Sequence, residues 1–405
     1  MADLRKASVL VVHGGGHIDL AMVRSLGQAG ARVTVGSPNG TGFARYSRYA
    51  HHILEFSSPD LREIASETIA FIQTGVVTHV ITAEESLIVH LNAQRAEIEP
   101  FATLLFPGSE AFAECLHKDR TLARAAHLGI PAPRTYVPPT LDDLHPCRDW
   151  TYPVVFKPNH RDPRLRHPSA RDYIASYAQT YDDLCAQVAQ LGPYADPPMI
   201  QEFAVGEGVG VEVLMRDGEP RLLFQHRRLR EKPATGGISV LCESEKLSPQ
   251  LADHAVRLLR DMRWDGVAMV EFRQDPATGE AKLLEVNGRF WGSLPLALHA
   301  GADFPAELLR TQLDRDYRPA QTYRVGARCR SLAHDTSSLF ETLRTGNRSR
   351  ARALWNYLVA FSPAVGGYVW NLRDPWPALR HPWQRLFRRV RPGVAVADRT
   401  REVKS

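Results

Sequence analysis

The segments Met269–Phe272 (MVEF) and Leu284–Ser293 (LEVNGRFWGS) decide the fold of this chain. In each segment a carboxylate lies within an apolar run, and a short polar turn separates the two, which predicts a β-hairpin. Antiparallel neighbours would place Glu271 and Glu285 within reach of one ion. Asn287 follows two residues later and so shares their face of the hairpin.

Carboxylate and amide oxygens, completed by phosphate oxygens, are the ligands that Mg²⁺ prefers. We therefore predict Glu271, Glu285 and Asn287 as ligands of Mg²⁺ (or Mn²⁺). By the same alternation Arg289 faces this site, and its planar guanidinium suits a phosphoryl oxygen. The alternative is a surface hairpin with exposed charges, which the apolar flanks disfavour because buried strands rarely hold unpaired carboxylates.

A lysine ends an earlier apolar strand, in the run Pro153–Pro158 (PVVFKP). Lys157 is the one charge in that run, so its ammonium is predicted to be a fixed counter-charge for phosphate. The polar loop at residues 159–169 follows directly. A mobile loop in that position can fold over a triphosphate and exclude water, so we expect it to act as a lid.

A possible adenine-binding edge begins at four residues, Gln201, Glu202, Phe203 and Ala204. Backbone amide and carbonyl groups there could pair with the edge of an adenine, while Phe203 covers the ring. Glu207 lies just beyond, where it could bind ribose hydroxyls. An ordinary strand and turn is the alternative reading of this stretch.

The first hundred residues alternate between short apolar strands and amphipathic helices, which is typical of a parallel sheet wrapped by helices. The turn His13–His17 (HGGGH) between the first strand and helix suggests a dinucleotide site, but the full glycine spacing and the acidic ribose ligand are both missing. A substrate loop or a plain tight turn explains it better.

Bulk properties fit a globular protein of two or three subdomains: 405 residues, 44% hydrophobic, 23% charged, net charge +5. The five cysteines show no paired spacing, and the N-terminus leaves no room for a signal peptide, so we expect a cytoplasmic protein.

Residues Ala353–Leu372 lack charge but contain Pro363 and Gly366, which favours a buried helix, a turn and a strand over a transmembrane span.

Together these residues resemble the ATP-grasp superfamily, nearest its carbamoyl-phosphate synthetase-like branch and the predicted carboxylate-amine ligases. The resemblance runs from about Lys118 to Phe304 and includes the motif Gly129–Pro133 (GIPAP). It implies an α/β and α+β chain: an N-terminal parallel-sheet domain (1–115), an ATP-grasp domain (116–315, with a lid subdomain at about 150–205) and a C-terminal α/β appendage (316–405). It also assigns Lys118 and Lys157 to nucleotide binding.

The resemblance implies that ATP phosphorylates a small carboxylate, and that an amine displaces phosphate from the acylphosphate, releasing ADP. Arg289, Lys157 and Arg227 are the predicted catalytic residues, Arg227 (or Arg230) gripping the carboxylate. Gly236, Gly237 and Ser239 could donate hydrogen bonds to a reacting oxygen. Glu84 or Glu85, at a strand end, could hold the amine; the alternative for both is a helix N-cap.

Three other functions stay open at this stage: a bicarbonate-using carboxylase or carbamoyl-phosphate-type enzyme, a kinase, and a non-catalytic nucleotide-binding module. Nucleic acid is not expected as a partner, because no aromatic stacking platform accompanies the basic residues. A homodimer is left open. The basic run Arg385, Arg388, Arg389 and Arg391 reads best as a solvated tail, with peripheral membrane contact as its alternative.

Overall fold

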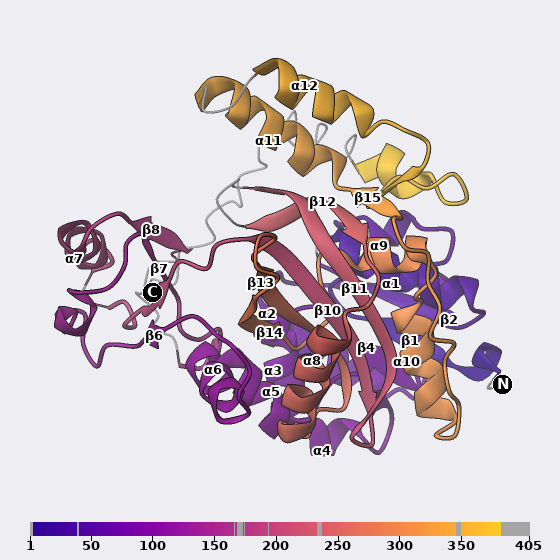
Figure 1. The fold of residues 1–405 in the computed structure, drawn as a ribbon. Coiled ribbons are helices and arrows are strands. Elements are labelled where there is room, and N and C mark those ends of the chain that lie inside the picture. The colour runs from indigo at the N-terminus through magenta and orange to yellow at the C-terminus, as the bar shows by residue number, and fades with distance from the viewer. Residues whose placement is uncertain are drawn as a thin grey trace, which may run out of the picture.

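The computed structural model describes residues 3–381, except 39, 166, 168–172, 174, 193, 233–236 and 346–349. Its described strands form three sheets of five, seven and four strands. Figure 1 shows the seven-stranded sheet at the centre, with the four-stranded sheet standing apart at one side and a helical hairpin above. The basic run at residues 385–391 lies outside the described residues.

The N-terminal sheet is parallel, with the strand order β3-β2-β1-β4-β5. Its strands are β1 (Ser8–Val11), β2 (Arg32–Pro38), β3 (His52–Phe56), β4 (His79–Ile81) and β5 (Thr103–Leu104), and its helices are α1 (His17–Gln28), α2 (Leu61–Ile72), α3 (Glu85–Ala93) and α4 (Arg95–Ile98). Asp60 begins α2 by accepting from two backbone amides of the first turn. The predicted alternation of strand and helix is therefore confirmed.

Two short helices, α5 (Ser109–Leu116) and α6 (Lys118–His127), lead into the four-stranded sheet. That sheet has the order β6-β9-β7-β8, built from β6 (Thr135–Tyr136), β7 (Val154–Lys157), β8 (Ser176–Ala178) and β9 (Met199–Glu202), with α7 (Tyr181–Ala189) against it. A separate small core, which includes Trp150, Phe156 and Leu184, holds it together. Its core is therefore separate from the larger cores that the central sheet shares with the N-terminal domain.

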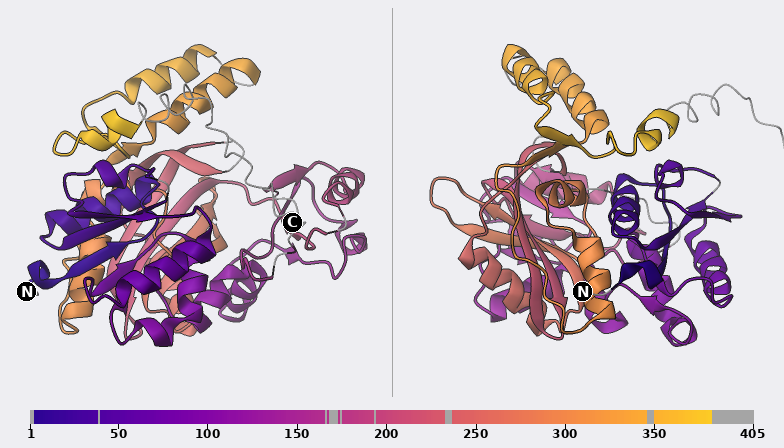
Figure 2. Two further views of the ribbon diagram at one scale, coloured as in Figure 1. Left: turned by 180° about the vertical axis from the view of Figure 1, so that it is seen from behind. Right: turned by 90° about the vertical axis from the view of Figure 1, so that its right-hand side faces the viewer.

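The central sheet has the order β14-β13-β10-β11-β12-β15-β16 and is antiparallel except at its last pair. Its elements are β10 (Glu207–Arg216), β11 (Glu219–Lys232), β12 (Ile238–Ser244), α8 (Pro249–Asp261), β13 (Gly266–Gln274), β14 (Ala281–Asn287), α9 (Leu294–Ala300), α10 (Phe304–Leu313), β15 (Arg328–Arg330) and β16 (Val365–Gly367). Helix α8 covers one face. The N-terminal domain covers the other through α9 and α10, and Figure 2 shows these two helices between it and the sheet.

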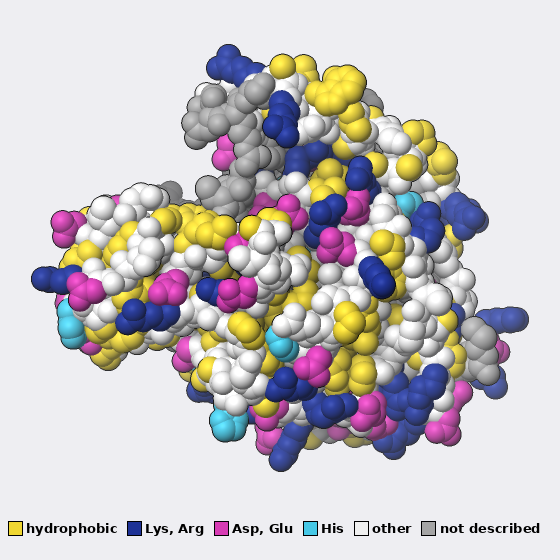
Figure 3. Space-filling view, viewed as in Figure 1, with side chains coloured by type: hydrophobic (Ala, Val, Ile, Leu, Met, Phe, Trp, Pro, Cys, Tyr) yellow, Lys and Arg dark blue, Asp and Glu magenta, His cyan; other side chains and the backbone are white. Residues whose placement is uncertain are grey.

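The C-terminal segment adds a helical hairpin, α11 (Leu332–Thr345) and α12 (Arg350–Val359), before β16. The predicted sequence of helix, turn and strand is present, but α12 is not buried: Trp355 is 67% exposed. Apolar side chains lie open on this hairpin (Figure 3). No helix of the described residues is long and apolar enough to cross a membrane.

Residues after β16 return to the N-terminal domain, where Asp374 is fully buried. Its carboxylate accepts hydrogen bonds from Arg24 Nε at 2.9 Å, from Ser47 Oγ at 2.8 Å and from the backbone amide of Arg48 at 2.9 Å. These bonds connect the two ends of the described chain.

The Asp374 carboxylate is expected to make a large contribution to stability. Asp374→Ala leaves the Arg24 guanidinium buried without its partner, so we expect a loss of about 3–5 kcal/mol in unfolding free energy. Urea unfolding of the full chain measures it, with the exposed Asp316→Ala as a control expected to change stability by less than about 0.5 kcal/mol. Equal stability of the two variants would contradict this role for Asp374.

Candidate active site

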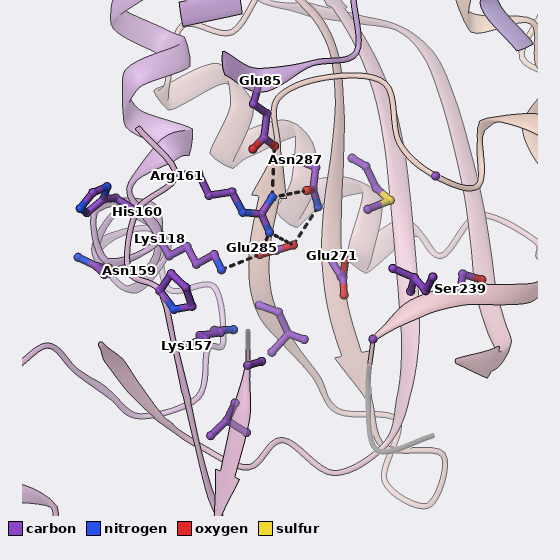
Figure 4. Close-up of a pocket in the computed structure, with 18 of the residues that line it drawn as sticks. Glu85, Lys118, Lys157, Asn159, His160, Arg161, Ser239, Glu271, Glu285 and Asn287 are labelled. Atoms are coloured by element: carbon purple, nitrogen blue, oxygen red, sulfur yellow. Dashed lines mark hydrogen bonds and ion pairs between the residues drawn. The ribbon is translucent and has the colours of Figure 1, made fainter. Parts of the chain in front are cut away.

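A cavity of about 1060 Å³ lies between the four-stranded sheet and the central sheet. Side chains from three parts of the chain line it: the N-terminal domain, the segment around Lys118, and the facing strands of both sheets. Figure 4 shows Glu85, Lys157, Arg161 and Glu285 pointing toward one another within it. Cationic and carboxylate side chains therefore share one cavity.

The predicted ligand set comes from adjacent strands. Glu271 on β13 is paired directly with Glu285 on β14, and Met269 is paired with Asn287, so the three polar side chains lie on one face of the sheet. Asn287 Nδ2 lies 3.2 Å from a Glu285 oxygen, and Glu271 is ion-paired to Arg228.

These three residues fit Mg²⁺ as far as their donor atoms go. They offer hard oxygen atoms, but among the described residues no three His, Cys, Asp or Glu side chains converge on one point. An ion held here would need further oxygen atoms, which is how Mg²⁺ is usually bound beside phosphate groups.

Two cations contact Glu285. Lys118 Nζ lies 3.4 Å from it, and Arg161 Nη2 lies 3.2 Å from it. Burial would raise the pKa of Glu285, but the charges of Arg161, Lys118 and Lys157 hold that pKa well below its usual range. The carboxylate is thus ionised at neutral pH.

The chain brings Lys118 and Arg161 together through backbone pairing. The amide of Lys118 donates to the carbonyl of Asn159 at 3.0 Å, and the amide of Arg161 donates to the carbonyl of Leu116 at 3.1 Å. The first residues of the predicted lid loop are therefore held against the α5–α6 junction. Arg161 belongs to the predicted lid loop, and its contact with the ligand set was not predicted from the sequence.

Lys157 ends β7 at the wall of the cavity, as expected. Burial, together with the neighbouring Lys118 charge, lowers the pKa of Lys157 to about 8. Between that value and its ordinary value near 10.5, the unfolded chain binds more protons than the folded chain, so this group makes stability rise with pH in that window.

The same shift predicts proton uptake on nucleotide binding. Phosphate groups favour the ammonium form, so binding of MgADP at about pH 8.5 should be accompanied by uptake of a fraction of a proton. Calorimetry in buffers with different ionisation enthalpies measures it. Lys157→Arg should reduce the uptake and Lys282→Arg, outside the cavity, should not; undiminished uptake in Lys157→Arg would contradict this assignment.

The predicted adenine edge lines the cavity where β9 ends. Gln201 is buried and donates from Nε2 to Thr135 Oγ1 at 3.0 Å. Its side chain therefore connects β9 to the neighbouring strand β6. Phe203 is 39% exposed and lies edge-on to Tyr177. Glu202, Phe203 and Ala204 all contribute to the cavity wall, which keeps this segment available to a planar ring.

Arg227 and Glu207 do not reach the cavity. Arg227 pairs with Glu243 at 2.9 Å and Glu245 at 3.3 Å, and Glu207 is exposed, 3.8 Å from Arg227. The neighbouring Arg228 lines the cavity instead. Successive strand residues point to opposite faces, so an error of one position in choosing the arginine reverses its side of the sheet.

Arg289 lines the cavity and lies 3.2 Å from Glu85, which also contacts Arg161. Glu85 is therefore a charge partner of two arginines, while Glu84 accepts from the amide of Ser86 as the cap of α3. Of the two acidic residues considered from the sequence, Glu84 is the helix cap. Ser239 and Gly237 line the cavity, and Gly236 lies outside the described residues.

Residues 195–334 match a family described as ATP-grasp in the biosynthetic pathway with Ter operon. A biotin carboxylase domain of Hydrogenobacter thermophilus 2-oxoglutarate carboxylase, in complex with MgADP, ADP and bicarbonate, is 13% identical, with 80% of this chain and 73% of that chain covered and a TM-score of 0.62. No curated protein matches the sequence significantly.

Two further solved structures are similar. N5-carboxyaminoimidazole synthetase from Staphylococcus aureus is 13% identical, covers 79% of this chain and 78% of its own, and has a TM-score of 0.58. L-amino acid ligase from Bacillus licheniformis is 16% identical, covers 76% of this chain and 75% of its own, and also has a TM-score of 0.58. The chain has the ATP-grasp fold, and the resemblance to that superfamily is confirmed.

Proposed function

We propose that this protein is an ATP- and Mg²⁺-dependent ligase that activates a small carboxylate as an acylphosphate and couples it to an amine, with release of ADP and phosphate. The observation that carries the proposal is the cavity itself. Three cations line it: Lys118, Lys157 and Arg289. The sheet face that carries Glu271, Glu285 and Asn287 lines it as well. Phosphoryl transfer requires alignment and neutralisation of charge, which such a set supplies without a protein nucleophile.

Each cation has a separate task in this proposal. Lys118 and Lys157 lie on the same side of the Glu285 carboxylate in Figure 4, so both are suited to hold the phosphate chain beside it. Arg289 is fixed by Glu85 and offers its guanidinium to the transferred phosphoryl group. Mg²⁺, when bound, would neutralise phosphate oxygens and orient them for transfer.

The carboxylate substrate is proposed to bind near Arg228 and Ser239. These residues lie on β11 and β12, on the other side of β10 from the strands that carry Glu271 and Glu285. Arg228 contacts Glu271 and Glu231 and is nearly buried, so its position is well defined. Ser239 is the second residue of the facing strand β12. The similarity to an L-amino acid ligase supports amino acids as the first substrates to test.

A trapping experiment tests the ligase proposal. The protein is incubated with MgATP, hydroxylamine and each proteinogenic L-amino acid in turn, and hydroxamate and ADP are measured. We expect hydroxamate with at least one amino acid, together with an equal amount of ADP. Formation of AMP, or of ADP without hydroxamate for every active substrate, would contradict an acylphosphate intermediate.

A bicarbonate-using reaction is the second candidate, because a biotin carboxylase domain of the same fold was crystallised with MgADP and bicarbonate. Carboxyphosphate would then replace the acylphosphate. Bicarbonate-dependent ADP formation without any added carboxylate, which disappears when carbon dioxide is removed from the buffer, would favour this reaction over the ligase.

A further inference from the structure

Glu212, His226 and Ser293 form a row of contacting side chains that ends at the cavity wall. None of them belongs to the proposed phosphate-binding residues Lys118, Lys157 and Arg289. Glu212 on β10 and His226 on β11 are completely buried, and His226 Nδ1 lies 2.7 Å from Glu212 Oε1. His226 Nε2 lies 3.2 Å from the hydroxyl of Ser293. Ser293 and the adjoining Gly292 line the cavity, whereas the other two residues lie behind them.

A glycine makes room for this arrangement. Gly210 is paired across the sheet with His226, and a Cβ at Gly210 would lie 2.5 Å from the imidazole and 2.9 Å from the Glu212 carboxylate. These distances are too short for any side chain. The sheet therefore accommodates the imidazole directly over its backbone.

The buried carboxylate constrains the proton on the imidazole. Among the described residues, neither Glu212 oxygen has an aligned hydrogen-bond donor, so His226 Nδ1, at 2.7 Å, is the group placed to donate a hydrogen bond to it. A buried carboxylate with no hydrogen-bond donor is very unfavourable. A proton on Nδ1 meets this requirement and leaves Nε2 as an acceptor for the Ser293 hydroxyl.

The loop that carries Ser293 is fixed from the N-terminal domain. His17, the first residue of α1, lies with its Nε2 2.9 Å from the carbonyl of Gly292. On β11, Arg228 follows His226 by two residues and so lies on the same face, beside Glu271. The Ser293 hydroxyl is thus presented to the same cavity as the proposed carboxylate site.

We propose that Ser293, His226 and Glu212 form a proton relay that deprotonates the attacking amine; this inference rests on the proposed ligase function. The amine nitrogen forms a bond to the acyl carbon while the bond from that carbon to the phosphate oxygen breaks, and phosphate leaves with the electron pair. The amine proton passes to Ser293 Oγ as the hydroxyl proton passes to His226 Nε2. Glu212 stabilises the resulting imidazolium, which returns its proton to solvent after product release.

Other titratable groups near the pair remain neutral. Cys242 on β12 and the Tyr323 phenol both face Glu212, and burial raises the pKa of each to about 12. Tyr368 contacts Cys242, and burial holds its pKa well above the ordinary value. Arg228 is the nearby permanent charge on β11. Cys242, Tyr323 and Tyr368 therefore add no negative charge beside the His226–Glu212 pair near neutral pH.

An NMR experiment tests the relay without any substrate. The protein is labelled with ¹⁵N-histidine, and the His226 signals are identified by their loss in His226→Gln. At about pH 8 we expect a neutral imidazole with its proton on Nδ1, and a loss of this preference in Glu212→Gln. A proton on Nε2, or an imidazolium that persists at about pH 9, would overturn the proposal.

A kinetic experiment separates this inference from the ligase function. With the amino acid that gives hydroxamate, its amide coupling to ammonia or a second amino acid is compared with hydroxamate formation. Hydroxylamine attacks unprotonated at neutral pH and needs little help from a base. His226→Gln and Ser293→Ala should therefore reduce amide formation by about 100-fold and hydroxamate formation far less.

The control is His254→Gln, which removes a buried imidazole from α8 outside the cavity and should leave both rates unchanged. Equal losses with both nucleophiles in the His226 and Ser293 variants would overturn the relay and indicate a structural role. Absence of hydroxamate in the unmodified protein would instead contradict the ligase function, and the NMR result would still decide whether the pair has the required proton arrangement.

Discussion

Asn287→Ala is expected to reduce ATP turnover by about 1000-fold, because it removes a neutral oxygen ligand of the metal without leaving a charge unpaired. Asn287 is buried and donates to Glu285. Glu285→Gln should cause a loss at least as large, since it also removes the countercharge of Lys118 and Arg161. Turnover is measured as ADP release with the active carboxylate present.

A binding measurement distinguishes loss of metal from loss of fold. Mn²⁺ binding in the presence of ADP, followed by electron paramagnetic resonance, should weaken in both variants while the circular dichroism spectrum is retained. Glu280→Gln, on the exposed turn of the same hairpin, is the matched control. Normal ADP release by Asn287→Ala and Glu285→Gln would rule out this metal site.

Lys157→Met and Arg289→Met are expected to reduce hydroxamate trapping by about 100-fold to 1000-fold, with little change in carboxylate binding. Both cations would strengthen their contacts as charge redistributes on the transferred phosphoryl group, so their loss acts mainly on the transition state. Methionine keeps the length and apolar character of the side chain. The trapping rate and the carboxylate dissociation constant are measured separately.

Lys282→Met serves as the control. Lys282 lies on β14, in the β13–β14 hairpin that carries Glu271 and Glu285, but it does not line the cavity. A stable phosphate ester, which hydroxylamine leaves untouched, would identify the reaction as that of a kinase. That result would leave the proposed ATP site unchanged and would contradict the proposed acylphosphate intermediate. Unchanged trapping in both variants would remove Lys157 and Arg289 from the phosphoryl site.

The sequence by itself determined the fold class and the geometry of the hairpin. Alternating apolar residues around Glu271 and Glu285 predicted adjacent strands, and the structure pairs these two residues directly. The strand at Val154–Lys157 and the parallel N-terminal sheet also follow from local patterns. Such features depend on the spacing of apolar residues, every two residues in a strand and about every 3.6 in a helix, and on turn residues. Both can be recognised within a short stretch of sequence.

The tertiary structure alone decided which distant groups meet. Arg161 contacts Glu285 because backbone pairing holds its loop against the α5–α6 junction. Ser293 reaches His226 because a loop from β14 packs over the centre of the sheet. The choice between Arg227 and Arg228 required knowing which face of β11 is turned to the cavity. Strand alternation leaves that choice open, because it fixes which residues share a face while packing fixes what each face contacts.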